Sequence, residues 1–131
     1  MTAAEKRLIG QARRARAKAF APFSGFQVGA AVETARGRIY TGANVESASY
    51  GLTVCAERVA IWKAVSAGER AFKRLAVVAD TERLTPPCGA CRQIIWEFCG
   101  DIEIILANLA GRSAVRRMKK LLPEPFDSSL L

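Results

Sequence analysis

Three cysteines and one glutamate are the residues of this sequence whose types and spacing could perform chemistry. Cys88 and Cys91 form a Cys-x-x-Cys pair in "PCGAC", and Cys55 stands two residues before Glu57 in "CAER". A Cys-x-x-Cys pair can be a redox pair, half of a structural zinc site or part of a catalytic zinc site. The pair follows "TPP" late in the chain rather than the first strand of a βαβ unit, which disfavours the redox use.

The third ligand of a zinc site must come from the other cysteines or from carboxylates, because the chain contains no histidine. Cys99 lies eight residues after Cys91, which is about 12 Å along a helix, whereas two sulfurs on one zinc ion lie only about 4 Å apart. We therefore interpret Cys99 as a small buried apolar residue. Cys55 is the better ligand, since the start of a helix favours a thiolate. Three thiolates leave one tetrahedral position for water, which is typical of a catalytic zinc site.

Glu57 and Arg58 follow this third cysteine directly. Taken alone, Glu57 would be a first-turn carboxylate that complements the helix dipole. Beside an open zinc position it becomes a candidate base for a metal-bound water molecule. Zn²⁺ with three thiolates carries a net charge of about −1, so we expect Arg58 to donate a hydrogen bond to a ligand sulfur and offset this charge. A generic surface arginine is the alternative for Arg58.

A set of helices and strands must position these residues. The expected elements are a helix within residues 1–20 that ends before Pro22, a hairpin over 26–40, a loop over 41–53, a helix over 55–67, a strand over 75–79, a helix over 88–99 and a strand over 102–107. Residues 108–122 are compatible with either a short helix or an edge strand. Strands that alternate with helices after an initial hairpin predict an α/β fold, a three-layer α/β/α sandwich with a mixed sheet of about five strands.

Length and composition are those of an ordinary globular chain. The 131 residues suit one domain over 1–131. No apolar run reaches membrane-spanning length, and the first residues lack the apolar core of a signal peptide, so a cytoplasmic protein with reduced thiols is expected. The net charge is +8, and residues 1–20 and 111–120 hold many of the 20 basic side chains. We interpret these two segments as solvated faces, and binding of a polyanion or an acidic partner is the alternative.

Four stretches of the chain resemble the small homotetrameric cytidine deaminases. They are "FSGFQVGAAV", "GRIYTGANVESASYGLTVCAER", "PPCGACRQ" and "LLPEPF". The ligand-x-Glu and Pro-Cys-x-x-Cys parts among them are the pattern of the zinc nucleobase deaminases. The resemblance implies one Zn²⁺ per subunit on Cys55, Cys88 and Cys91, with Glu57 as the catalytic proton shuttle. It also implies hydrolysis of cytidine, 2′-deoxycytidine or both to the uridine product and ammonia, a reaction of pyrimidine salvage.

The resemblance also assigns contacts to a small pyrimidine nucleoside and an assembly with shared active sites. Implied contacts are Phe26 against the pyrimidine, Asn44 and Glu46 on the ribose hydroxyls, the Ala56 backbone on the base, and Tyr50 and Phe126 at a neighbouring subunit's site. Without the family, each of these side chains could instead be a core, cap or anchor residue. The implied partners are a nucleoside and identical subunits, rather than a membrane or nucleic acid.

Two other functions are compatible with parts of the sequence. A polynucleotide deaminase would use the two basic segments, but no basic groove with interleaved aromatic residues is visible. Contacts that enclose the ribose hydroxyls would also leave no room for the next nucleotide of a polynucleotide. A structural zinc module would require four protein ligands and no exchangeable water.

Overall fold

The computed structural model describes all residues, 1–131, and its elements alternate between helices and strands. In chain order they are α1 (Ala3–Arg16), β1 (Val28–Thr34), β2 (Ile39–Ala43), α2 (Ala56–Ser66), β3 (Phe72–Ala79), α3 (Gly89–Cys99), β4 (Glu103–Ala107), β5 (Ser113–Arg117) and α4 (Met118–Leu121), with 3₁₀ turns at Tyr50–Leu52 and Ser128–Leu130.

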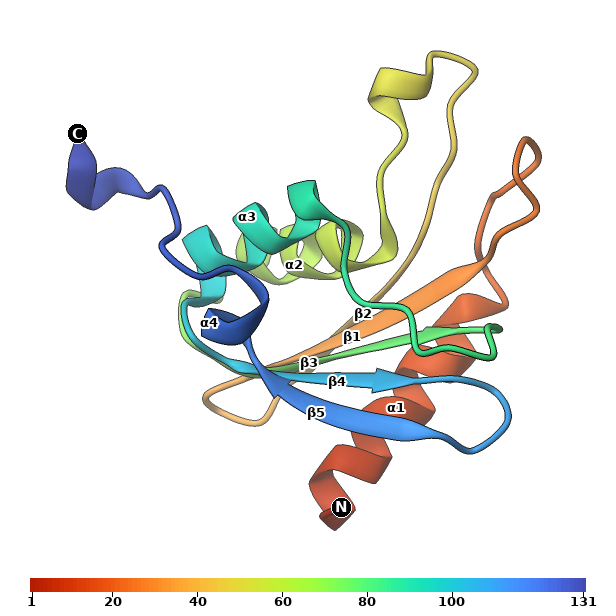
Figure 1. Ribbon diagram of the computed structural model, residues 1–131, viewed down its shortest axis with the longest axis horizontal. Helices are drawn as coiled ribbons and strands as arrows, with labels where there is room; N and C mark the ends of the chain where they lie inside the picture. The colour runs from red at the N-terminus through yellow and green to blue at the C-terminus, as the bar shows by residue number, and fades with distance from the viewer.

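One five-stranded sheet in the order β2-β1-β3-β4-β5 forms the middle of the protein. Strand β1 pairs antiparallel with β2 and β3, β4 pairs antiparallel with β5, and β3 and β4 run parallel. Helix α3 lies between β3 and β4 in the chain, as a parallel pair requires. Figure 1 shows α1 on one side of the sheet and α2 and α3 on the other. The predicted three-layer sandwich with a mixed sheet of about five strands is therefore confirmed.

Alternate residues of the central strands build a separate core on each face of the sheet. On the α2 and α3 side, Val32, Leu75 and Val77 belong to a buried cluster with Ile61 and Ile95 from the helices. On the α1 side, small residues dominate, and Leu8 and Ala12 of α1 pack with Ala31, Ala76 and Ala107. This period of two explains why the strands read as continuous apolar runs, since both faces are covered.

Helix α1 approaches β1 very closely at Gly29. A Cβ atom at this position would lie 2.0 Å from the Ala12 carbonyl oxygen and 2.6 Å from the Arg16 nitrogen. No side chain fits in this space. The glycine therefore sets the distance between the first helix and the sheet.

Several expected boundaries are corrected by the structure. Strand β3 begins at Phe72, three residues before the predicted start, because its first residues pair with the far end of β1. Residues 41–43 belong to β2 rather than to the following loop. Helix α1 lies within the predicted residues 1–20 and ends at Arg16, six residues before Pro22.

Residues 108–122 contain both of the structures that the sequence left open. Strand β5 occupies the edge of the sheet beside β4, and α4 follows it at once. Met118 begins this helix and is fully buried against the core under α3.

No helix of the chain combines the length and the apolar character that crossing a lipid bilayer requires.

The contact at Gly29 leads to a prediction about stability. Gly29→Ala is expected to lower the free energy of unfolding by about 1–3 kcal/mol or more, because the added methyl group forces α1 away from β1. Gly10→Ala, in helix α1 itself, is the matched control, because its new Cβ meets only the end of the Arg14 side chain at 3.7 Å. This control should gain about 0.5–1 kcal/mol from helix propensity. Urea unfolding at fixed zinc and protein concentrations measures both, and equal effects would contradict the close contact.

Candidate metal centre and active site

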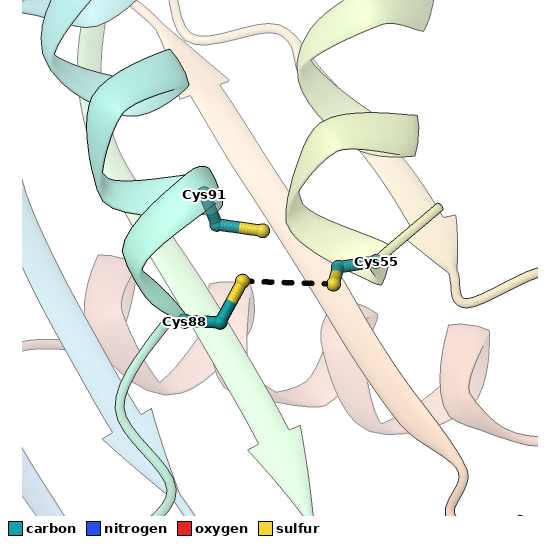
Figure 2. A group of neighbouring side chains, drawn as sticks. All are labelled: Cys55, Cys88 and Cys91. Carbon is teal, nitrogen blue, oxygen red and sulfur yellow. Dashed lines mark hydrogen bonds between the residues drawn. The ribbon is translucent and has the colours of Figure 1, made fainter. Parts of the chain in front are cut away.

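Two helix N-termini bring the three predicted zinc ligands together. Cys55 is the N-cap residue of α2 and Cys88 is the N-cap residue of α3, while Cys91 lies in the first turn of α3. Neither N-cap sulfur makes a capping hydrogen bond to the backbone of its own helix. Figure 2 shows the three thiol groups lying close together between the starts of the two helices.

The spacing of the sulfurs suits a single metal ion. The Cys55 and Cys88 Sγ atoms are 3.8 Å apart, and all three Sγ atoms lie within 4.8 Å of one another. Two thiolates on one tetrahedral zinc are about 4 Å apart, so little movement is needed to bind the ion. No carboxylate or further cysteine joins the cluster. The geometry therefore fits zinc with three protein ligands and one open position.

Cys99 does not take part in this site. It is the last residue of α3 and packs against the core cluster on the α2 and α3 side of the sheet. Burial raises the pKa of its thiol to about 12. Its interpretation as a small apolar packing residue is confirmed, although the residue is partly rather than fully buried.

Hydrogen bonds from its neighbours make Cys55 the easiest of these groups to ionise. The pKa of Cys55 falls to about 5, chiefly through the hydrogen bond with Cys91 and further through Arg58 and Cys88, which together outweigh burial. The pKa of Cys91 is raised, chiefly by the same hydrogen bond with Cys55 and then by burial. The two thiols thus shift each other's pKa in opposite directions, and because a metal ion binds thiolates, its binding would release the protons that these cysteines retain.

Arg58 lies where the sequence predicted it. Its Nη2 atom donates to Cys55 Sγ at 3.5 Å. Its Nε atom is buried and has no hydrogen-bond partner within the chain. Contact with the ligand sulfurs, first of all Cys55, raises the pKa of the guanidinium. A permanent positive charge therefore touches the group of thiols.

Glu57 is a buried carboxyl group next to the sulfurs. It is the second residue of α2 and only 4% exposed. Burial raises its pKa to about 7, against smaller opposing effects that include Arg58 and a hydrogen bond from Cys91. Cys55 and Glu57 would point about 200° apart on a continuous helix. They can share one site because Cys55 precedes the helix and has an extended backbone, with φ −71° and ψ 155°.

A cavity of ≈ 240 Å³ opens beside this group and contains most of the predicted site residues. The predicted residues that line it are Phe26, Asn44, Glu46, Cys55, Ala56, Glu57 and Cys88. The lining also includes Ser24, Thr53, Thr85 and Pro86. These four residues are not among the predicted site residues, because short polar and proline residues in loops carry no pattern that separates a cavity wall from an ordinary turn.

Asn44 and Glu46 build the wall of the cavity through their hydrogen bonds. The Asn44 side chain accepts from the Val28 N–H at 2.8 Å and donates to the Phe26 carbonyl at 2.8 Å. Glu46 Oε1 accepts from the N–H groups of Phe23 and Ser24, and Glu46 Oε2 accepts from the Ser24 hydroxyl. The Ser24 hydroxyl lowers the pKa of Glu46. A carboxylate has about four acceptor sites, so capacity for one ligand donor remains at Glu46.

Tyr50 and Phe126 lie outside this cavity within one chain. Tyr50 is 75% exposed and packs edge-to-face on Phe23 with 6.0 Å between ring centroids. Phe126 is 58% exposed, in a C-terminal segment that extends away from the sheet (Figure 1). That segment is held to α3 by hydrogen bonds from Gln93 to the Phe126 carbonyl and from Trp96 to Asp127.

A mixed sheet that carries three convergent cysteines and a buried glutamate at two helix starts defines the class of zinc deaminases. Residues 2–107 match the family described as the cytidine and deoxycytidylate deaminase zinc-binding region. The chain belongs to this family. The predicted membership of the cytidine deaminase family is therefore confirmed, and so is zinc as the cofactor that the three cysteines are able to hold.

Individual relatives cover nearly the whole chain. It is 51% identical over 123 residues to a cytidine deaminase of Sporosarcina psychrophila, across 93% of this chain and 90% of that protein. It is 51% identical over 122 residues to a cytidine deaminase of Halalkalibacterium halodurans, across 92% of each. The crystal structure of cytidine deaminase from Burkholderia pseudomallei matches with a TM-score of 0.90 at 46% identity, covering 96% of this chain and 100% of that one.

The contact between Arg58 and Cys55 predicts a role in metal affinity. Arg58→Ala is expected to weaken zinc binding about 10- to 100-fold, because the ligand thiolates lose a hydrogen-bond donor and a positive charge. Competition with a chromophoric chelator measures the affinity. Lys63→Ala removes an exposed charge from the same helix and should leave the affinity unchanged. Equal affinities for wild type and Arg58→Ala would contradict this role.

Proposed function

We propose that this protein catalyses the hydrolytic deamination of cytidine, 2′-deoxycytidine or both to the corresponding uridine nucleoside and ammonia. The observation that carries the proposal is the buried Glu57 carboxyl, which meets the three-cysteine metal site in one cavity. Family membership and relatives named cytidine deaminase support the choice of substrate. Pyrimidine salvage is the corresponding cellular role.

In this mechanism Glu57 handles the protons. Cys55, Cys88 and Cys91 would hold Zn²⁺, which when bound would supply a Lewis acid that lowers the pKa of water. Glu57 accepts the proton of the water that attacks C4 and delivers it to N3 of the base. It then takes the second proton from the hydroxyl group now on C4 and passes it to the amine, so that the C4–N bond breaks, ammonia leaves and C4 becomes the carbonyl of the uridine product. A carboxyl whose pKa lies near 7 can both accept and donate at neutral pH.

The remaining cavity residues orient the nucleoside. Phe26 is half exposed at the cavity and provides an apolar surface for the pyrimidine ring. Asn44 and the free acceptor site of Glu46 face the cavity where the ribose hydroxyls would lie. The Ala56 backbone at the start of α2 would contact the polar edge of the base. These assignments are part of the proposal and rest on the family resemblance together with the cavity lining.

Replacement of Glu57 by glutamine tests the reaction. The wild-type protein should convert cytidine to uridine, followed by the change in absorbance, and Glu57→Gln should lose about 10²- to 10⁴-fold in kcat because no group transfers the protons. The amide has nearly the same shape, so folding and zinc content should be preserved and are measured as controls. No turnover by zinc-loaded wild type, or full turnover by the variant, would overturn the proposal.

We further propose that the active protein is a homotetramer with shared active sites. Apolar side chains are exposed along one part of the chain, namely Phe20, Phe23, Val45, Tyr50, Leu52 and Trp62. An apolar hollow of ≈ 720 Å³ lies over α2 and its neighbouring loop, lined in part by Tyr40, Val54 and Trp62. Surfaces of this kind favour association between subunits. Tyr50 and Phe126 would then reach a neighbour's cavity.

Mixed assemblies test the sharing of sites. Glu57→Gln chains and Phe126→Ala chains should each be weakly active, but tetramers that contain both should regain activity, because one chain supplies Glu57 and its neighbour supplies Phe126. Coexpression with distinct tags isolates the mixed assemblies, and light scattering gives their mass. Glu57→Gln mixed with chains that carry both substitutions is the control and should stay inactive. Activity of the mixture equal to the mean of its parents would contradict shared sites.

We also propose that residues 1–131 act as one catalytic domain in the cytoplasm, on free nucleosides rather than on nucleic acid. A single sheet carries both buried clusters and the site. The basic residues of α1 support the choice of small substrates, because α1 covers the face of the sheet opposite α2 and α3 (Figure 1). These charges therefore do not border the cavity.

A further inference from the structure

A second hollow, distinct from the metal centre, lies where the β3–α3 loop meets the edge of the sheet. Its volume is ≈ 280 Å³. The lining residues are Arg83, Leu84, Pro86, Leu106, Arg112 and Arg116. They come from the loop after β3, the end of β4, the β4–β5 turn and β5. Only Pro86 also lines the cavity that contains Glu57, so the two sites adjoin without overlapping.

The three arginines of this hollow have no acidic partners. Ion pairs occur elsewhere in the chain, for example between Arg117 and Asp101, but none involves Arg83, Arg112 or Arg116. No carboxylate lines the hollow. Three positive groups that converge on one space repel one another unless an anion lies between them.

A buried asparagine holds the two sides of the hollow together. The Asn108 side chain donates to the carbonyl of Thr81 at 3.0 Å and accepts from the N–H of Arg112 at 2.9 Å. It thus joins the β4–β5 turn to the loop that carries Arg83. The Arg112 guanidinium also donates to the Glu82 carbonyl at 3.4 Å. The arginines therefore project from a tied framework rather than from independent loops.

We propose that this hollow binds the phosphate group of a small phosphorylated molecule or inorganic pyrophosphate. The guanidinium group matches phosphate oxygens with paired hydrogen bonds and binds them more strongly than neutral groups. Leu84, Pro86 and Leu106 provide an apolar floor that limits competition from water. The site is independent of the proposed deamination, since it contains neither a metal ligand nor Glu57.

Titration calorimetry with inorganic pyrophosphate and with ADP, at constant ionic strength, tests the proposal on the zinc-loaded protein. The double variant Arg83→Gln/Arg116→Gln should weaken binding of both by about 100-fold, because it removes two guanidinium bonds to a charged group and each contributes about 1.4 kcal/mol, or about tenfold. Neither residue makes an ion pair, and Arg116 bonds only within its own strand, so the fold should be retained. Thermal melting checks this.

The control is Arg13→Gln/Arg14→Gln, which makes the same change in net charge on the exposed face of α1. It should bind both probes like wild type. ADP bound more tightly than pyrophosphate, with the same dependence on the arginines, would identify a nucleotide as the ligand, whereas equal affinities would identify the free phosphate group. No binding, or an equal loss in both double variants, would overturn the proposal.

Discussion

The start of α2 rests directly on β2, and the metal centre depends on this contact. A Cβ atom at Gly42 would lie 2.5 Å from both the Ala56 carbonyl and the Ala60 nitrogen, so the helix can reach this position only over a glycine. The contact fixes the position of the Ala56 backbone, and with it the positions of the neighbouring Cys55 and Glu57. The parallel pair of β3 and β4 then requires a crossover through α3, whose first residues bring Cys88 and Cys91 to the same place.

Burial and charge oppose each other within this site. Burial raises the pKa of Glu57 toward neutrality, whereas hydrogen bonds from its neighbours lower the pKa of Cys55 in spite of burial. Two negative groups this close repel each other. The positive charge of Arg58 and the N-termini of the two helices reduce this repulsion. One short segment, residues 55–58, thus supplies a ligand, a proton carrier and a compensating charge.

A single chain forms the inner part of the nucleoside cavity but leaves several apolar groups outside it. Asn44, Glu46 and Ser24 are tied to backbone groups of the loop before β1, which makes this wall rigid before any ligand binds. Tyr50 and Phe126 have no comparable support on the sides that face away from the chain. The contrast divides the molecule into a preorganised site and exposed apolar side chains that the same chain leaves uncovered.

The sequence by itself determined the layers of the fold, the ligand set and the exclusion of Cys99. Strand periodicity, glycine and proline breaks and the rise of a helix are local properties, so the sequence is enough to predict the features that depend on them. Residues 108–122 were open because propensity cannot decide whether a short segment pairs with a neighbouring strand, and β4 decided it. Only the tertiary structure decided that Cys55 and Glu57 converge, that Ser24 supports Glu46, and that three arginines share one hollow. The first depends on where α2 begins, since Cys55 has an extended backbone just before the helix. The other two depend on contacts between segments far apart in the chain, about which local spacing carries no information.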